Sequence, residues 1–175
     1  PEWETWQTVV ARCYAAGLQT DAAIGRIADK LDTLGLAEDT VFVIAADHGD
    51  GIAAHGAGWD KYSSFTEEVG RIPLVVRYPA QIAAGQKVDA PVSLLDVTAT
   101  MLGAGGAVPA DHPLPMDGDN LIDIAGGTTV RDHLICDHFG HSGDISFQKI
   151  LYHDGWKYTS VWGDDDELYC LDGDP

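Results

Sequence analysis

The sequence predicts an α/β fold, in which helices cover a layered sheet, followed by a small antiparallel meander. A helical pattern over residues 5–34 leads into the unbroken apolar run 41–46, as expected for a helix that precedes a buried strand. A second apolar run, 72–78, is followed by another helical pattern. Later in the chain, two β-rich runs flank Asp154-Gly155, a dipeptide typical of tight hairpins.

Residues 5–34 carry apolar side chains at spacings of three and four, the pattern of an amphipathic helix, and Gly35 is expected to end it. Asp21 lies on the same stripe, which predicts a partly buried, hydrogen-bonded carboxylate with a structural role in preference to a catalytic one. The run 41–46 is apolar throughout and contains β-branched residues. It therefore predicts a strand covered on both faces, as in a parallel sheet.

The second strand, 72–78, is expected to end before Pro79. The helix that follows is expected to begin after Ser93 as its N-cap and to stop at Gly103. Residues 107–120 are rich in proline, aspartate and glycine, which indicates a surface connection.

The C-terminal part is predicted to be an antiparallel meander, with runs on either side of Asp154-Gly155 and a third short strand at 167–171. We therefore divide the chain into an α/β part, 1–125, and a small β subdomain, 126–175, truncated at its end. Histidines in this part suggest a second metal site or the lining of a substrate pocket, but nearby glycines favour ordinary loop residues. These histidines are His133, His138, His141 and His153.

The composition narrows the classes of function. The chain has 175 residues, 45% of them hydrophobic, which is enough for a packed core. Its formal net charge is -18, with only ten lysines and arginines, so nucleic acids and anionic membrane surfaces are not expected partners. No apolar run approaches the about 20 residues that span a bilayer, and the three scattered cysteines indicate neither a zinc site nor a disulfide framework. The cellular compartment stays open.

The candidate site begins where the first strand ends, at Asp47 and His48. In open α/β sheets, ligands bind outside the carboxyl ends of the strands. Because Gly49 frees the backbone, the carboxylate and the imidazole can turn toward one point and form half of a site for Ca²⁺, Mg²⁺ or Mn²⁺. Taken alone, the dipeptide is more typical of a surface turn, since two ligands cannot complete the coordination of such a cation.

A segment of small residues, 49–61, follows and suits close approach to a ligand. It contains His55 and Lys61, which both donate hydrogen bonds and so suit the oxygens of an anion. Lys61 would place a fixed positive charge near the metal, where it would stabilise a tetrahedral oxyanion. The local sequence leaves open whether Lys61 is instead a solvated surface lysine and His55 a loop or packing residue.

Several ordered motifs resemble the sulfatase family, within the alkaline-phosphatase-like superfamily. The segment AADHGD…AAHGAGWDKYSSFTEEVGRIPLVVRYP is similar to the family's strand ending in S-D-H-G, its H-G-x-W-x-K, its helix with Glu-Glu and its V-P-L strand. The segments VSLLDVTATMLGAGG, MDGDNL and GWKYTSV…DELYCLDGDP resemble later motifs, so nearly the whole chain is covered. Departures include Ala46 in place of serine and a spacing from His55 to Lys61 that is one residue longer than usual.

The resemblance implies part of an alkaline-phosphatase-like layered sheet and a sulfuric ester hydrolase. Asp47 and His48 would hold the cation, for which the family favours Ca²⁺, while Mg²⁺ or Mn²⁺ are alternatives. Lys61 would contact the sulfate, and His55 would assist. The substrate would be a sulfated small molecule or sulfated carbohydrate, attacked by a hydrated formylglycine.

The formylglycine motif of the family, C-x-P-x-R or S-x-P-x-R, does not occur in this sequence. We therefore expect the C-terminal portion of a sulfatase, with the nucleophile upstream and no activity of this portion alone. Two alternatives stay open: a phosphonate monoester or phosphodiester hydrolase of the same superfamily, and a non-catalytic metal-binding module.

Overall fold

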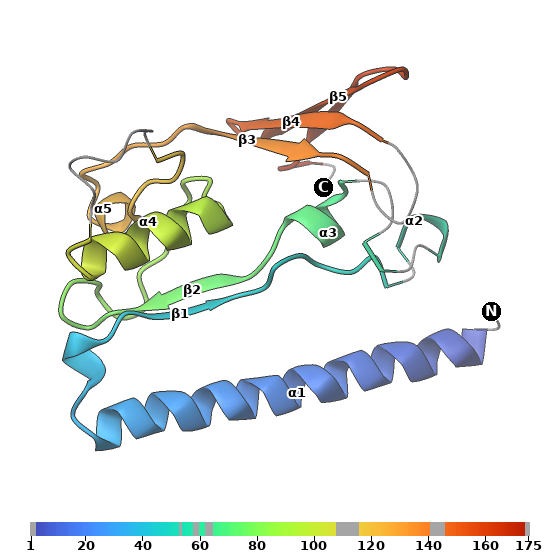
Figure 1. Cartoon of the computed structure of the whole chain (residues 1–175). Coiled ribbons are helices and arrows are strands. Elements are labelled where there is room, and N and C mark those ends of the chain that lie inside the picture. Colours follow the sequence, from blue (N-terminus) through green and yellow to red (C-terminus); the bar gives the residue numbers. More distant parts are fainter. Residues whose placement is uncertain are drawn as a thin grey trace.

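The fold places two sheets on one side of a long helix, as Figure 1 shows. This computed structural model describes residues 3–52, 54–57, 60–61, 65–107, 116–140 and 146–173. The helices are Trp3–Thr33 (α1), Ala54–Ala57 (α2), Glu67–Gly70 (α3), Leu94–Ala104 (α4) and Leu121–Ala125 (α5), with a 3-10 turn at Ala37–Asp39. The strands are Phe42–Ala45 (β1), Leu74–Arg77 (β2), His133–His138 (β3), Gln148–His153 (β4), Trp156–Val161 (β5) and Glu167–Cys170 (β6). Strands β1 and β2 form one sheet, and β3 to β6 form the other.

Helix α1 forms as its apolar spacing predicts, and Gly35 ends it. Gly35 has φ +68°, and Leu36 donates its N–H to the carbonyl of Leu31, which completes a Schellman motif. No described residue of α1 is buried, so the predicted partial burial of Asp21 is wrong and its carboxylate faces solvent. The reason is that α1 lies at the outside of the fold, with β1 and β2 on one side of it (Figure 1).

Strands β1 and β2 pair antiparallel, from Phe42 opposite Arg77 to Ala45 opposite Leu74. The prediction that the first strand belongs to a parallel sheet is therefore wrong for the strands that the structure describes. A parallel pair needs a crossover connection, usually a long helix that packs on the sheet. Only the short helices α2 and α3 are described between β1 and β2, and the chain reverses direction instead. The prediction that the first strand is covered on both faces is also wrong for the described residues, since Phe42–Ile44 are half-buried and Ala45 is exposed. An apolar run reports neither the direction of a strand nor how many of its faces are covered.

Helix α4 begins after Ser93, whose hydroxyl accepts the N–H of Leu95, so the predicted N-cap is confirmed. The predicted stop at Gly103 is wrong. The helix runs one residue further, and the left-handed residue behind it is Gly106, with φ +65°. A Cβ at Gly103 would lie 2.9 Å from the side-chain amide nitrogen of Asn120, so a larger residue there would require this side chain to move.

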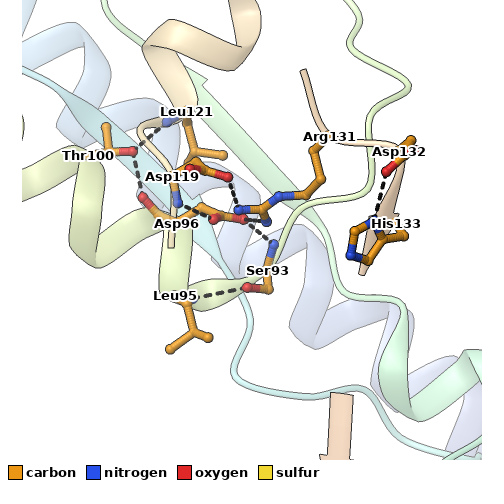
Figure 2. Close-up of polar contacts among 9 residues, drawn as sticks. All are labelled: Ser93, Leu95, Asp96, Thr100, Asp119, Leu121, Arg131, Asp132 and His133. Atoms are coloured by element: carbon orange, nitrogen blue, oxygen red, sulfur yellow. Dashed lines mark hydrogen bonds and ion pairs between the residues drawn. The ribbon is translucent and has the colours of Figure 1, made fainter. Parts of the chain in front are cut away.

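The start of α4 carries a buried carboxylate that ties distant segments together (Figure 2). Asp96 is 0% exposed and accepts the backbone N–H groups of Ser93 at 2.6 Å and Asp119 at 2.8 Å. Arg131 donates to Asp96 at 2.8 Å and also to the Asp119 carboxylate. Burial opposes the charge on Arg131, but these hydrogen bonds outweigh it and raise the pKa of the guanidinium. The cluster fixes α4 against the segment that leads into β3.

The four-stranded sheet has the order β3-β4-β5-β6, and each neighbouring pair is antiparallel, so the predicted meander is confirmed. Asp154 and Gly155 have φ values of +48° and +74°, as a two-residue type I′ hairpin requires. The predicted third short strand is present as β6.

Histidines of this sheet lie in strands, so their assignment to loops is wrong where the structure describes them. His133 and His138 begin and end β3, and His153 ends β4. Strand β3 alternates exposed and half-buried residues, but its sequence does not show this period, because the apolar Ile135 lies on the exposed side. His141 lies outside the described residues. The division into 1–125 and 126–175 stays a prediction.

Replacing Gly155 by alanine is expected to lower the free energy of unfolding by about 1–2 kcal/mol, because alanine is strained in a left-handed conformation. A Cβ at Gly155 would also lie 2.6 Å from a carboxylate oxygen of Asp172. Urea denaturation measures the change. The matched control is Gly17→Ala in α1, where nothing lies within 4 Å of the Cβ position and alanine is expected to add about 0.5–1 kcal/mol. Equal effects of both substitutions would contradict the assigned turn.

Among the residues that the structure describes, the buried apolar side chains come from α3, α4, α5 and β4. They are Val69, Ala99, Leu121, Ile124 and Ile150. Among the helices that the structure describes, none is both long enough and apolar enough to cross a bilayer.

Candidate functional site

The segment after β1 brings Asp47 and His48 together. The backbone N–H of His48 donates to Asp47 Oδ1 at 3.0 Å, and His48 Nε2 lies 3.5 Å from Asp47 Oδ2. The side chain of Asp47 is 86% exposed and that of His48 is 35% exposed, so the carboxylate faces solvent while the imidazole is partly packed. Their polar atoms therefore share one accessible point beyond the end of the strand.

Lys61 reaches the same point from further along the chain. Its Nζ lies 3.3 Å from His48 Nε2. The other ring nitrogen, Nδ1, lies 2.8 Å from the carbonyl oxygen of Gly49. Because a carbonyl only accepts, Nδ1 carries the proton of the neutral ring, and Nε2 presents a lone pair to the Lys61 ammonium. The structure thus brings together three of the four side chains that the sequence singles out.

The negative charge of Asp47 is stabilised by its surroundings. Hydrogen bonding from the backbone of His48 lowers the pKa of the Asp47 carboxyl, and hydrogen bonding from its own backbone and the nearby Lys61 ammonium lower it further, while burial opposes them. The carboxylate is therefore ionised at neutral pH and loses its charge only as the pH falls through this lowered pKa. An ionised carboxylate beside an imidazole lone pair suits a cation.

Glycine at position 49 lets the site segment lie directly on α3. The N–H of Gly49 donates to the carbonyl of Val69 at 2.9 Å. A Cβ at Gly49 would lie 1.8 Å from the carbonyl oxygen of Glu68, so a larger residue would displace α3. Further along, Gly51 donates to the carbonyl of Asp60 at 2.9 Å, which closes the loop. Helix α3 therefore supports the candidate site.

His55 is held by α3. Its Nε2 lies 3.2 and 3.1 Å from the two carboxylate oxygens of Glu68. Backbone hydrogen bonding lowers the pKa of Glu68, burial opposes this, and the contact with His55 lowers it again. Within the described part of the chain, the His55 side chain bonds to Glu68 and not to Asp47, His48 or Lys61. Its predicted role beside Lys61 stays a prediction.

Asp47 and His48 have the chemistry of cation ligands, but the described residues do not complete a site. In the described ranges, no group of three or more His, Cys, Asp or Glu side chains is arranged to hold a metal ion. A metal-bound histidine usually donates its other ring N–H to a carbonyl or carboxylate, as His48 Nδ1 does to Gly49. The pair therefore fits half of a divalent-cation site.

Comparisons with known proteins identify the family. The sulfatase family model matches residues 1–107, and the model of the N-sulphoglucosamine sulphohydrolase C-terminal region matches residues 55–175. The chain belongs to the sulfatase family. It spans about a sixth to a third of the length of the curated sulfatases it matches, from 17% to 31%.

Individual sulfatases and a related hydrolase show how far the likeness extends. Choline-sulfatase of Rhizobium meliloti (strain 1021) is 28% identical over 94% of this chain and 31% of its own length. The structure of BT4656 in complex with its substrate D-glucosamine-2-N,6-O-disulfate is 25% identical, with a TM-score of 0.77, over 90% of this chain and 33% of that one. Phosphonate monoester hydrolase of Agrobacterium radiobacter is 24% identical, with a TM-score of 0.71, over 86% of this chain and 32% of that one, which is a likeness of fold. The predicted alkaline-phosphatase-like fold is confirmed.

Three charged residues at or next to α3 have no role that the sequence predicts. Glu67 and Glu68 occur only within a family pattern, and Lys157 only within a predicted strand. One signal for the burial of Lys157 is the two-residue period of β5. It places Lys157 on the same face as Thr159, and both are buried. A lysine on the inner face of a strand needs a partner.

Proposed function

We propose that this chain is part of a sulfuric ester hydrolase and supplies half of its divalent-cation site together with a sulfate-binding lysine. The observation that carries the proposal is the convergence at His48 Nε2, with Lys61 Nζ at 3.3 Å and Asp47 Oδ2 at 3.5 Å. Membership of the sulfatase family supports the same class of reaction. A fixed positive charge beside a pair of cation ligands suits an anion that binds next to a metal.

Asp47 and His48 would hold the cation, which we take to be Ca²⁺, with Mg²⁺ and Mn²⁺ as alternatives. A bound divalent cation would offset negative charge on the sulfate oxygens. Contacts within the chain prepare both ligands, because backbone hydrogen bonding keeps Asp47 ionised and the Gly49 carbonyl fixes the tautomer of His48. The ring then presents Nε2 on the side of the Asp47 carboxylate.

Lys61 would bind the sulfate group. An ammonium has three N–H donors, and in this structure Nζ lies 3.3 Å from His48 Nε2. When a cation takes the Nε2 lone pair, these donors would be free to bind sulfate oxygens. When the bond between sulfur and the ester oxygen breaks, negative charge develops on the departing oxygen, where Lys61 would stabilise it. His55, held by Glu68 through Nε2, would assist by donating a proton to that oxygen from its other ring nitrogen, Nδ1.

A formylglycine nucleophile would come from sequence outside residues 1–175, since neither C-x-P-x-R nor S-x-P-x-R occurs within them. Catalytic experiments therefore belong on the full-length product of the gene that encodes this chain. We propose a sulfated carbohydrate or a sulfated small molecule as the substrate. The support is that BT4656 is solved with a disulfated glucosamine and that another relative is a choline-sulfatase.

Turnover of matched aryl esters tests the proposed reaction. With Ca²⁺ present, the full-length gene product is expected to hydrolyse an aryl sulfate faster than the corresponding aryl phosphonate monoester, and chelation of the metal is expected to abolish turnover. Faster hydrolysis of the phosphonate would replace the proposal with the phosphonate monoester hydrolase alternative. Binding of Ca²⁺ without turnover of either ester would favour a non-catalytic metal-binding module.

A further inference from the structure

A lysine is buried in the four-stranded sheet, far along the chain from the candidate site. Lys157 lies in β5 and is only 4% exposed. Burial alternates along the strand, with Lys157 and Thr159 inside and Trp156 and Tyr158 outside. A buried ammonium is unfavourable unless it is paired and hydrogen-bonded. The folded protein must therefore supply groups that pair with the Lys157 ammonium and accept its hydrogen bonds.

The segment that leads into α3 provides these partners. Lys157 Nζ donates to the carbonyl oxygen of Phe65 and to Glu67 Oε1, the latter at 3.2 Å. Tyr152, opposite Lys157 in β4, donates its hydroxyl to the same Glu67 oxygen at 2.9 Å. Burial raises the pKa of Tyr152, so that hydroxyl keeps its proton. The rings of Phe65 and Tyr152 each lie 5.7 Å from Nζ, within the range of a cation–π contact.

Helix α3 depends on contacts of this kind for its position. It has only four residues, Glu67–Gly70, and a helix this short is not stable by itself. In the part of the chain that the structure describes, its N-cap residue Thr66 makes no side-chain capping hydrogen bond. The ion pair between Lys157 and the first residue of α3 joins the helix to the four-stranded sheet, which lies next to it in Figure 1.

Helix α3 in turn holds two parts of the candidate site. Val69 accepts the N–H of Gly49 at 2.9 Å, and the carbonyl of Gly49 binds the ring of His48. Glu68 binds His55 at 3.1 Å. Direct contacts therefore run from the four-stranded sheet through α3 to both histidines.

We propose that Lys157 is a positioning residue for the candidate site, because it fixes α3 and, through α3, the ring of His48 and the side chain of His55. A lysine suits this role because one ammonium binds a backbone carbonyl and a carboxylate together and so sets both the place and the direction of the helix. The catalytic consequence of this inference rests on the proposed function.

The first test replaces Lys157 by methionine, which is unbranched and one heavy atom shorter and removes the charge, in the full-length gene product. The imidazole NMR signals of His48 and His55 are expected to move, and kcat/KM for an aryl sulfate is expected to fall about 10–100-fold, mostly through kcat. Lys149→Met is the matched control, since Lys149 is also a strand lysine in an ion pair, with Asp137 at 2.6 Å, but is exposed. The control is expected to leave both signals in place and to change kcat/KM by less than about twofold.

A second variant keeps the test decisive if Lys157→Met does not fold. Tyr152→Phe removes one hydrogen bond to Glu67 and leaves the ammonium in place, so it is expected to move the same two imidazole signals by a smaller amount. A folded variant whose His48 and His55 signals and kinetic constants match the wild type would overturn the proposal. If both signals move in a protein that hydrolyses neither aryl ester, the positioning role stands and the proposed sulfatase reaction fails.

Discussion

Replacing Asp96 by alanine is expected to lower the free energy of unfolding by about 3–5 kcal/mol, because it breaks a buried ion pair. The carboxylate is 0% exposed and accepts hydrogen bonds from Ser93, Asp119 and Arg131. Its removal leaves the guanidinium of Arg131 without its buried partner. The N–H groups of Ser93 and Asp119 also lose their acceptor, and a buried donor without an acceptor is costly.

Urea denaturation of the wild type and the Asp96→Ala variant measures this loss. The matched control is Asp119→Ala, because Asp119 also binds Arg131 but its side chain is 47% exposed. The control is expected to cost about 0–1 kcal/mol, as for other exposed ion pairs. Equal losses for the two alanine variants would contradict the role assigned to the buried carboxylate.

Replacing Lys61 by methionine is expected to lower kcat/KM for a sulfate ester by about 10²–10³-fold in the full-length gene product, because a positive charge at the reacting group is lost. Lys61 Nζ lies 3.3 Å from His48 Nε2 and so stands beside the proposed cation ligands. If the ammonium stabilises charge that develops on the departing oxygen, the loss falls mainly on kcat. Steady-state kinetics with an aryl sulfate measures it.

The matched control for this substitution is Lys87→Met, because Lys87 is an exposed lysine in the connection after β2. Its kinetic constants are expected to stay within about twofold of the wild type. A Lys61→Met variant that is folded and retains wild-type kcat and KM would show that this lysine does not bind the sulfate.

Elements with a strong local pattern could be predicted from the sequence. Helix α1 follows from its apolar spacing, the start of α4 from Ser93, and the β4–β5 hairpin from Asp154-Gly155. In each case a few neighbouring residues determine the backbone conformation through capping, periodicity or the left-handed conformation of a turn. The adjacency of Asp47 and His48 is local information of the same kind.

Features that depend on contacts between distant segments could not be predicted in this way. The ion pair of Asp96 with Arg131 joins residues 35 positions apart, and that of Glu67 with Lys157 joins residues 90 positions apart. Apart from the alternation of β5 at Lys157, the local sequence does not distinguish these charged residues from ordinary surface groups, and the fold shows that they are buried or half-buried. The direction of β2 relative to β1 is set by the connection between them and not by the composition of either strand.

The contact between Lys61 and His48 could be predicted in part. Glycine-rich sequence indicates a loop that approaches a ligand, but it does not say which end of the loop meets the strand. The family resemblance supplies that expectation, and the structure places the two side chains in contact. The catalytic and metal-binding roles of Asp47, His48, His55 and Lys61 stay predictions.

Calorimetric titration with Ca²⁺ tests most directly whether Asp47 and His48 hold a divalent cation. The full-length gene product is expected to bind Ca²⁺. Its affinity for Ca²⁺ is expected to fall about 10–100-fold in the Asp47→Asn variant and in the His48→Gln variant. Asp50→Asn, which changes an exposed carboxylate in the same segment, is expected to retain the wild-type affinity. Wild-type Ca²⁺ affinity in both the Asp47→Asn and the His48→Gln proteins would contradict the account.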